Sequence, residues 1–406
     1  KGPKALGELP ATLAQVAKGA RLDTARSADE VLGSLRPELA YEEAFKVGYL
    51  SVPRRGPPLL LLSEVEPSVP SERVGRVASR LAEDGADVIV VGATPSWPPA
   101  ELGKRVREAL RAGRPVLAEA PNLGMAEEAI SVGAEGVFAS PELAVEAKGE
   151  LKGIVVVASS RDITELRRVE SELRGSRLVV DPVVDVPPLG LAKSIERYQE
   201  ASARLSSPVL FSAADATEDV EADTGGMHAL LALIAVELRA SAYLVVEETY
   251  KSMRGTAEAR EAIRLAEAAW QGKSTERGMF SRLLVLKQAT SPPTVRPQDE
   301  VERVGYVEPR MSSDQYLIIS TDHNSGEVLV TFMKDGRPQG TVSGKHAMSV
   351  ARAAVRRFGL EPEHAAYLGY EVAKAELALK LGRTYTQDEP IIVTPWEKNG
   401  NSGGRH

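Results

Sequence analysis

The 406-residue chain contains no cysteine. This absence excludes disulfide bonds, metal sites built on thiolates and a cysteine nucleophile. Long apolar runs are lacking too: stretches such as 58–62 and 154–158 are far too short to span a bilayer, and no signal peptide or basic amphipathic presequence is visible. We therefore expect no membrane partner and a cytoplasmic location.

An excess of positive charge is also missing. The formal net charge is -7, from 50 Lys and Arg against 57 Asp and Glu. A nucleic-acid partner bound by bulk charge is therefore not expected, although a local basic patch is compatible with this balance. Hydrophobic residues make up 43% and charged residues 26%, which is ordinary for a globular chain of two or three domains. The lack of cysteine and the 26 prolines favour a heat-adapted, thermophilic source.

Alternation between strands and helices is the strongest pattern that is present. Eight helical segments of mixed charge each follow a short apolar run. Eight such units favour an α/β fold, a closed TIM (β/α)8 barrel, and an open doubly wound sheet stays as the alternative. The predicted strands are 59–63, 88–92, 116–119, 136–139, 154–158, 178–181, 209–212 and 243–247, and the helices are 71–83, 100–112, 125–132, 141–147, 163–173, 191–205, 226–239 and 257–271.

The remaining chain is arranged around this barrel, which we place at 57–275. Residues 1–56 form an N-terminal segment, with helices expected at 11–17 and 42–45. A proline-rich linker follows the barrel at 276–298 and the tail 393–406 is expected to be disordered. Between them, 299–392 predicts a small α+β domain, with strands at 315–320, 327–333 and 339–342 and helices at 347–358 and 363–381.

Acidic residues gather where the predicted barrel strands end. Active groups of such barrels lie at the C-terminal mouth, where converging carboxylates bind a cation, exchange protons or accept hydrogen bonds from an N–H-rich ligand. Solvated loop acids are the alternative, and it is weakest where a carboxylate directly ends an apolar strand, as at Glu119 and Asp181. The acids concerned are Glu64, Glu119, Asp181, Asp215, Glu247 and Glu248.

Two basic residues lie beside these acids. Lys251 and Arg254 open the last predicted barrel helix, where backbone N–H groups and the helix dipole also favour an anion. They are therefore candidates for binding a ligand phosphate, with two solvated loop charges as the alternative.

Several segments resemble a known family. Residues 61–67 (Leu-Leu-Ser-Glu-Val-Glu-Pro) and 85–94 stand where dihydropteroate synthase has its first- and second-strand motifs, and 178–182 (Leu-Val-Val-Asp-Pro) matches its sixth-strand Asp-Pro signature. Segments 364–369, 373–379 and 385–388 resemble the archaeal dihydropteroate synthase-like proteins, in which an uncharacterised domain follows the barrel. That resemblance implies an archaeal source and a domain upstream of Lys1, of which 1–56 would be a remnant.

The resemblance also implies roles for individual residues. Pterin binding would fall to Glu119, Asp181 and Asp215, because the 2-amino-4-oxo edge of a pterin presents adjacent N–H donors that a carboxylate accepts. Glu64 stands where the family has an asparagine that binds metal and diphosphate, so it is the candidate ligand for a Mg²⁺ cofactor. The family's Ser-Arg-Lys on strand seven and Arg-x-His on strand eight are absent, replaced by residues 212–215 and 247–251. Most of the cations that would hold a diphosphate leaving group are therefore missing.

Three functions stay open from the sequence. The resemblance implies a C–N bond-forming transferase that condenses a dihydropterin methyl diphosphate with an arylamine in archaeal folate or methanopterin-type biosynthesis. The missing cations favour a barrel that binds a pterin or another small molecule without this chemistry, for methyl transfer or regulation. An assembly scaffold is the third reading, since the alanine-rich helix 363–381 is suited to packing against the barrel or against a second copy in a homodimer.

Overall fold

A computed structural model describes residues 39–276, 282–286, 301–302, 304–305 and 314–392. The chain divides into two compact units, residues 1–292 and 293–406. The helix expected at 11–17, most of the linker 276–298 and the tail 393–406 lie outside the described residues. No helix among the described residues is long and apolar enough to cross a membrane.

The first unit is a closed parallel barrel, as predicted. Its eight strands pair in the order β8-β7-β6-β5-β4-β3-β10-β9, and a parallel bridge from Val180 to Val209 joins the two ends of this order. Closure excludes the open-sheet alternative. The strands are β3 (Leu60–Val65), β4 (Val88–Val91), β5 (Val116–Glu119), β6 (Gly136–Ala139), β7 (Val155–Ser159), β8 (Arg177–Asp181), β9 (Leu210–Ser212) and β10 (Ala242–Val245).

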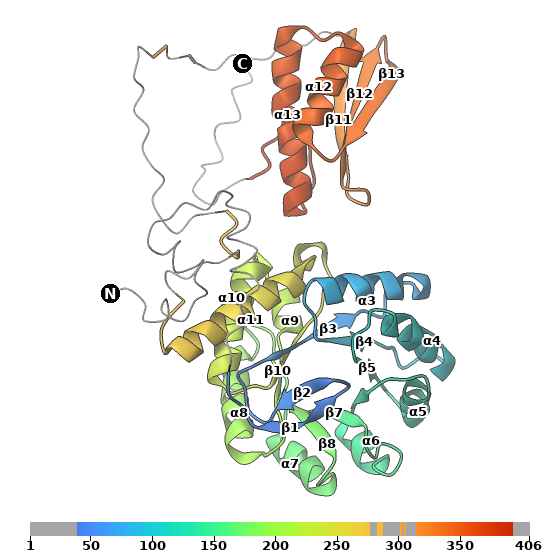
Figure 1. Ribbon diagram of the computed structural model, residues 1–406, viewed down its shortest axis with the longest axis vertical. Helices are drawn as coiled ribbons and strands as arrows, with labels where there is room; N and C mark the ends of the chain where they lie inside the picture. The colour runs from blue at the N-terminus through green and yellow to red at the C-terminus, as the bar shows by residue number, and fades with distance from the viewer. Residues whose placement is uncertain (1–38, 277–281, 287–300, 303, 306–313, 393–406) are drawn as a thin grey trace. The chain divides into compact units, whose positions relative to one another are not determined.

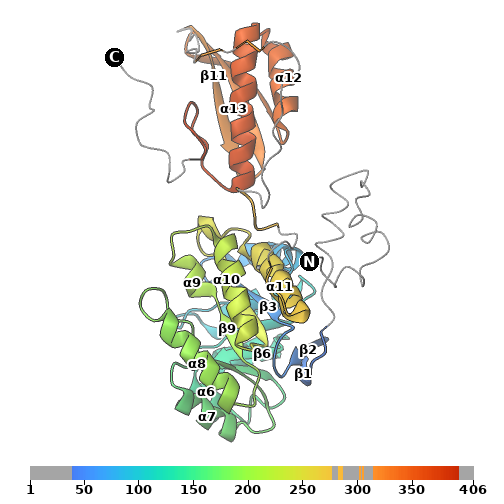
Figure 2. The same ribbon diagram turned by 90° about the vertical axis from the view of Figure 1, so that its left-hand side faces the viewer.

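Helices surround these strands on the outside (Figure 1), and α8, α10 and α11 lie along one flank (Figure 2). Their apolar faces pack on the outward side chains of the strands, which leaves the polar faces in water. The helices are α3 (Val74–Glu83), α4 (Pro99–Leu110), α5 (Leu123–Ser131), α6 (Pro141–Glu146), α7 (Ile163–Glu172), α8 (Leu191–Arg204), α10 (Thr224–Glu237) and α11 (Gly255–Gly272). Short turns of helix add η2 (Ser71–Arg73), which begins the helix predicted at 71–83, and η3 (Tyr250–Ser252) and α9 (Ala214–Glu218), which the sequence pattern did not predict.

The segment before the barrel is a hairpin, so the helix expected at 42–45 is wrong. Strands β1 (Glu43–Val47) and β2 (Leu50–Pro53) pair antiparallel through a turn at Gly48, whose φ of +54° suits glycine. Val47 and Val52 join the apolar cluster inside the barrel. A Cβ at Gly48 would lie 3.0 Å from Pro115, which precedes β5, so the hairpin covers the N-terminal end of the barrel. The gain from burying this apolar face overrides the local helical pattern.

The second unit is a three-stranded antiparallel sheet covered on one face by two helices, as predicted (Figures 1 and 2). Its core combines apolar residues from alternate strand positions, such as Leu317, Ile319, Val328 and Val330, with the inner faces of the helices. The elements are β11 (Gln315–Asp322), β12 (Glu327–Lys334), β13 (Arg337–Gly344), α12 (Ala347–Phe358) and α13 (Pro362–Leu381).

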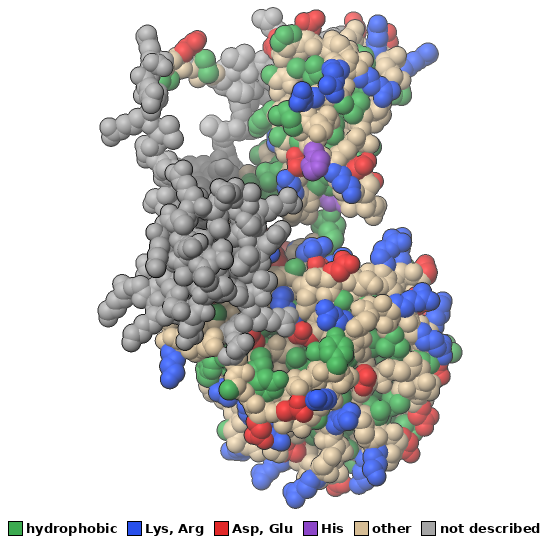
Figure 3. Space-filling view, in the orientation of Figure 1, with side chains coloured by type: hydrophobic (Ala, Val, Ile, Leu, Met, Phe, Trp, Pro, Cys, Tyr) green, Lys and Arg blue, Asp and Glu red, His purple; other side chains and the backbone are tan. Residues whose placement is uncertain are grey.

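The surface of the barrel unit mixes charges of both signs. On the face shown in Figure 3, Lys and Arg side chains are interspersed with Asp and Glu, and small apolar side chains lie between them. On this face of the barrel unit, charges of neither sign form a continuous surface.

Candidate functional site

The C-terminal mouth of the barrel is lined by carboxylates because of the two-residue period of the strands. The barrel interior is packed with apolar side chains that include Leu62, Leu117 and Val179. Side chains at i and i+2 of a strand share one face, so the next inward positions are Glu64 on β3, Glu119 on β5 and Asp181 on β8. The three acids predicted from the sequence thus belong to the top layer of the interior.

Glu64 and Glu119 are neighbours across β4. At the inward position between them stands Gly92, where a Cβ would collide with Glu64 Oε1 and lie 2.7 Å from Pro67 Cδ. Glycine therefore provides the space that the Glu64 carboxyl group occupies. Glu119 Oε2 accepts a hydrogen bond of 3.1 Å from the backbone N–H of Ala93, just beyond Gly92.

Burial changes the protonation of this pair. It raises the pKa of Glu64 to about 8, and the charges of Glu119, Glu66 and Asp215 add to the shift. Burial also raises the pKa of Glu119, while the hydrogen bond from Ala93 works in the opposite direction. At neutral pH Glu64 is therefore a carboxylic acid that can donate a hydrogen bond, and the oxygens of the neighbouring Glu119 carboxyl group can accept hydrogen bonds.

Asp181 is held firmly by the barrel. Its Oδ1 accepts hydrogen bonds from the Val183 backbone N–H at 2.9 Å and from the Tyr198 hydroxyl at 3.0 Å, and its Oδ2 accepts one from Ser159 Oγ at 3.0 Å. A carboxylate offers about four acceptor positions, so one position on Oδ2 remains for a ligand. Burial raises the pKa of Asp181 and these three hydrogen bonds oppose the rise.

Asp215 and Glu248 lie at the rim of the mouth. Asp215 lies in the first turn of α9 and is exposed as a residue, but its carboxyl group is partly desolvated. This desolvation and the charge of Asp219 raise the pKa of Asp215, and the charge of Arg161 lowers it. The pKa of Glu248 is raised first by the charge of Glu66 and then by burial. The rim of the mouth therefore carries more negative charge than the nearby cations neutralise.

Glu247 has a different role from the one expected of a mouth acid. Its Oε2 accepts from Arg80 at 2.7 Å and from the backbone N–H of Arg254 at 3.1 Å, and its Oε1 accepts from the backbone N–H of Thr256 at 3.1 Å. The carboxylate thus occupies the N-terminus of α11, which the sequence suggested for an anion of the ligand.

The two basic candidates also have partners within the protein. Lys251 Nζ donates to the Val220 carbonyl at 2.6 Å, and Arg254 Nη2 forms an ion pair of 2.6 Å with Asp84. A ligand phosphate at this position would have to compete with these contacts and with Glu247. Anion binding by Lys251 and Arg254 stays a prediction. In the structure both side chains form contacts within the protein.

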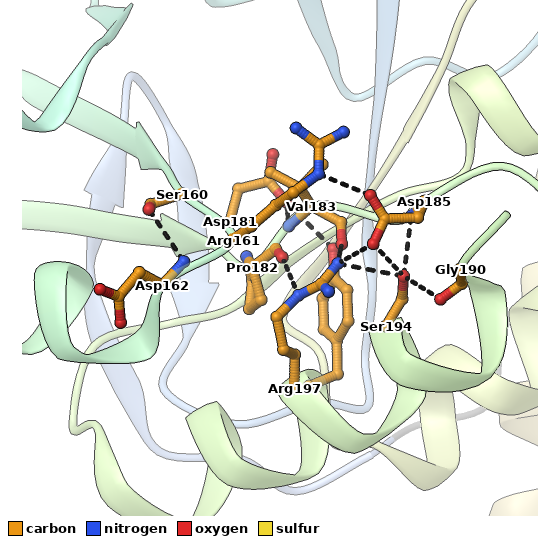
Figure 4. Close-up of polar contacts among 11 residues, drawn as sticks. Ser160, Arg161, Asp162, Asp181, Pro182, Val183, Asp185, Gly190, Ser194 and Arg197 are labelled. Carbon is orange, nitrogen blue, oxygen red and sulfur yellow. Dashed lines mark hydrogen bonds and ion pairs between the residues drawn. The ribbon is translucent and has the colours of Figure 1, made fainter.

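Sequence reasoning missed a pair of arginines on the opposite side of the mouth. Arg161 follows β7 by two residues and Arg197 lies on α8, and both bind the carboxylate of Asp185 beyond β8 (Figure 4). The available signal was the position of Arg161 just after a predicted strand, which is where active groups of a barrel are placed.

A resident metal ion is not supported by the arrangement of the donors. Within the described part of the chain, no group of three or more His, Cys, Asp or Glu side chains is placed to hold one. Mg²⁺ prefers a near-octahedral shell of oxygen ligands, and the Glu64–Glu119 pair supplies only two protein residues toward it. Glu64 as a Mg²⁺ ligand therefore stays a prediction, and the chemistry below uses no metal.

Fold and site together define a (β/α)8 barrel with an acidic mouth, joined in one chain to a small α+β unit. The family model described as PterinBD-DUF4346 matches residues 306–388, which belong to the second unit. An uncharacterised protein of Methanocaldococcus jannaschii is 24% identical over 394 residues, 87% of this chain and 73% of that protein.

Solved structures similar to the chain include two dihydropteroate synthases. The DHPS of Yersinia pestis with a pterine-sulfa conjugate is 16% identical with a TM-score of 0.45, and the match covers 56% of this chain and 99% of that one. The enzyme of Thermus thermophilus in complex with 6HMPPP is 21% identical with a TM-score of 0.40, covering 52% of this chain and 94% of the other. The assignment of the barrel itself rests on the strand pairing described above.

Proposed function

We propose that the barrel binds a pterin-class ligand, a flat and N–H-rich heterocycle, at its C-terminal mouth. The observation that carries this proposal is the top interior layer of Glu64, Glu119 and Asp181. Three carboxyl groups with raised pKa values, one buried and two half-buried, are costly unless a ligand supplies hydrogen-bond partners. The name of the family model that matches the second unit, PterinBD-DUF4346, also refers to pterin binding, which supports the same ligand class.

The three carboxyl groups would divide the recognition of the heterocycle. The open acceptor position on Asp181 Oδ2 takes one ligand N–H, and the Glu119 carboxylate accepts another. Protonated Glu64 donates to a ring nitrogen or carbonyl oxygen. This combination of donor and acceptors matches a ring edge on which both kinds of group alternate.

Titration of a dihydropterin into wild type and Asp181→Asn tests the proposal. The amide can keep its oxygen toward Val183 and Tyr198 and turn its NH₂ group toward Ser159 Oγ, so folding is preserved. The NH₂ group then removes the acceptor that the ligand needs. We expect a loss of about 2 kcal/mol, roughly thirtyfold in affinity.

Asp162→Asn is the matched control for this experiment. Asp162 caps the N-terminus of α7 and accepts from the Thr164 N–H, and Asn caps helices equally well. The affinity of Asp162→Asn for the dihydropterin should equal that of wild type. If wild type binds no dihydropterin at millimolar concentration, or Asp181→Asn binds as well as wild type, the pterin assignment fails and the scaffold alternative replaces it.

Condensation of the pterin with an arylamine is the narrower second candidate. It requires a cation to neutralise the diphosphate that leaves when the amine attacks the exocyclic methylene carbon. Lys251 and Arg254 are engaged elsewhere, but Arg161 provides a cation at the mouth. Incubation with a dihydropterin methyl diphosphate and 4-aminobenzoate should yield the coupled product if this activity is present. Binding without turnover would instead favour a non-catalytic pterin-binding barrel.

A further inference from the structure

Arg161 is fixed in place by a network that reaches into the barrel wall (Figure 4). Its Nε donates to Asp185 Oδ1 at 2.5 Å, and the other oxygen of Asp185 accepts from Arg197 Nη2 at 2.7 Å. The backbone N–H of Asp185 donates to Ser194 Oγ at 2.7 Å. Asp185 thus has hydrogen bonds to Arg161, Arg197 and Ser194, and it fixes the Nε side of the Arg161 guanidinium.

Arg197 anchors the network from below. Its Nε donates to the Pro182 carbonyl at 2.9 Å and its Nη2 donates to the Val183 carbonyl at 2.6 Å. Arg197 therefore fixes the backbone of the loop that follows Asp181. Its side chain is only 16% exposed. The loop that carries Asp185 is therefore tied to the same strand end that carries the proposed pterin-binding acid.

The outer edge of the Arg161 guanidinium is open. Among the described residues neither of its terminal nitrogens has a hydrogen-bond partner, and the side chain is 67% exposed. Its charge acts on Asp215, which lies in α9 after β9, two strands further round the barrel. Arg161 therefore presents two parallel N–H groups at the rim, in a mouth otherwise dominated by acids.

We propose that Arg161 binds an acidic group, a carboxylate or a phosphate, on the ligand that the mouth acids hold. The two terminal nitrogens of a guanidinium match two oxygens of such a group in a bidentate pair, and Asp185 preorganises the fork. The ligand is then amphoteric, with its N–H-rich end on the buried carboxyl groups and its acidic end on the β7–β8 side of the mouth. This inference rests on the proposed function for the identity of the N–H-rich end.

A purely structural role for Arg161 makes a different prediction. If Arg161 only ties the loops after β7 and β8 together, its loss weakens every ligand to the same extent. If it contacts the acidic group, its loss weakens only ligands that have one. The comparison of a neutral with an acid-bearing ligand separates the two roles.

The experiment uses calorimetry of the full chain with three probes: 6-hydroxymethylpterin, pterin-6-carboxylate and 6-hydroxymethylpterin monophosphate. Wild type should bind at least one acid-bearing probe about tenfold or more tightly than the neutral one. Arg161→Gln should abolish that preference and leave the neutral probe unchanged, and Arg161→Lys should retain part of it. Which acid-bearing probe gains affinity tells whether the group is a carboxylate or a phosphate.

Arg168→Gln is the control, because Arg168 lies on α7 with 53% of its side chain exposed and should not affect any probe. Equal weakening of all probes by Arg161→Gln, or no preference in wild type, overturns the inference. If the neutral probe fails to bind, the proposed function fails separately. In that case inorganic diphosphate and 4-aminobenzoate are titrated alone to test Arg161. If wild type binds either one and Arg161→Gln does not, the inference is sustained. If wild type binds neither, the inference is overturned.

Discussion

Replacing Glu64 by Gln tests whether the mouth holds a protonated acid. The amide has nearly the shape of a carboxylic acid and carries no charge, so it reproduces the protonated form at every pH. In the wild type the pKa of Glu64 is about 8 in the folded protein, against an ordinary value of 4.5. The two proteins should therefore have similar stability in acid and diverge as the pH rises.

The sign and size of the divergence follow from proton linkage. Because the folded-state pKa is raised, the contribution of Glu64 is fully present below pH 4.5, falls as the unfolded chain ionises, and is lost once the pH passes 8. The pKa rises from 4.5 to about 8, and each pKa unit is equivalent to about 1.4 kcal/mol. Wild type should thus lose up to about 5 kcal/mol relative to Glu64→Gln, and less if the mouth admits water.

Urea denaturation at pH 5, 7 and 9 measures this difference, with Trp97 and Trp270 reporting fluorescence from the barrel unit. The free energy of unfolding of Glu64→Gln should exceed that of wild type at pH 9 by several times the difference at pH 5. Glu237→Gln is the control, since Glu237 is exposed on α10 and should show no such dependence. A constant difference across the three pH values would refute the burial of Glu64 as described here.

Two further changes probe the packing of each unit. Gly92→Ala places a methyl group against Glu64 and Pro67, so urea denaturation should show a loss of about 1–3 kcal/mol, whereas Gly149→Ala, with open space around it, should not. In the second unit, Glu371→Ala removes a buried carboxylate and leaves the half-buried Lys374 ammonium without its ion-pair partner, so hydrogen-exchange protection in α13 should fall by about 3–5 kcal/mol. Lys380→Ala, which breaks an exposed pair in the same helix, should cost under about 1 kcal/mol.

Much of the fold could be predicted because the barrel strands have a simple signature. A parallel strand buried on both faces is a continuous apolar run, and eight such runs alternate with helices. The same regularity located Glu64, Glu119 and Asp181, since each stands two residues beyond an interior apolar side chain. The hairpin at residues 43–53 was missed because its burial depends on the end of the barrel that it covers, and no local pattern encodes that surface.

The loops of the mouth could not be predicted to the same degree. Side-chain direction in these loops depends on backbone conformations that cannot be predicted from the sequence, such as the positive φ of Val183 and Arg254. Arg254 consequently turns to Asp84, and Glu247 fills the helix terminus that an anion was expected to occupy. Arg161 was overlooked for the same reason: its partner Asp185 follows the neighbouring strand β8, and the conformations of the two loops bring the side chains together.

The two ends of the barrel differ in a way that argues for function at the mouth. At the N-terminal end the hairpin closes the interior with Val47 and Val52, and the layers above it are apolar. A barrel selected only for stability would continue this packing to its other end. Instead the last layer contains three carboxyl groups, and their raised pKa values record an energetic cost. Such local departures from good packing are typical of binding sites, because a ligand can supply the missing partners.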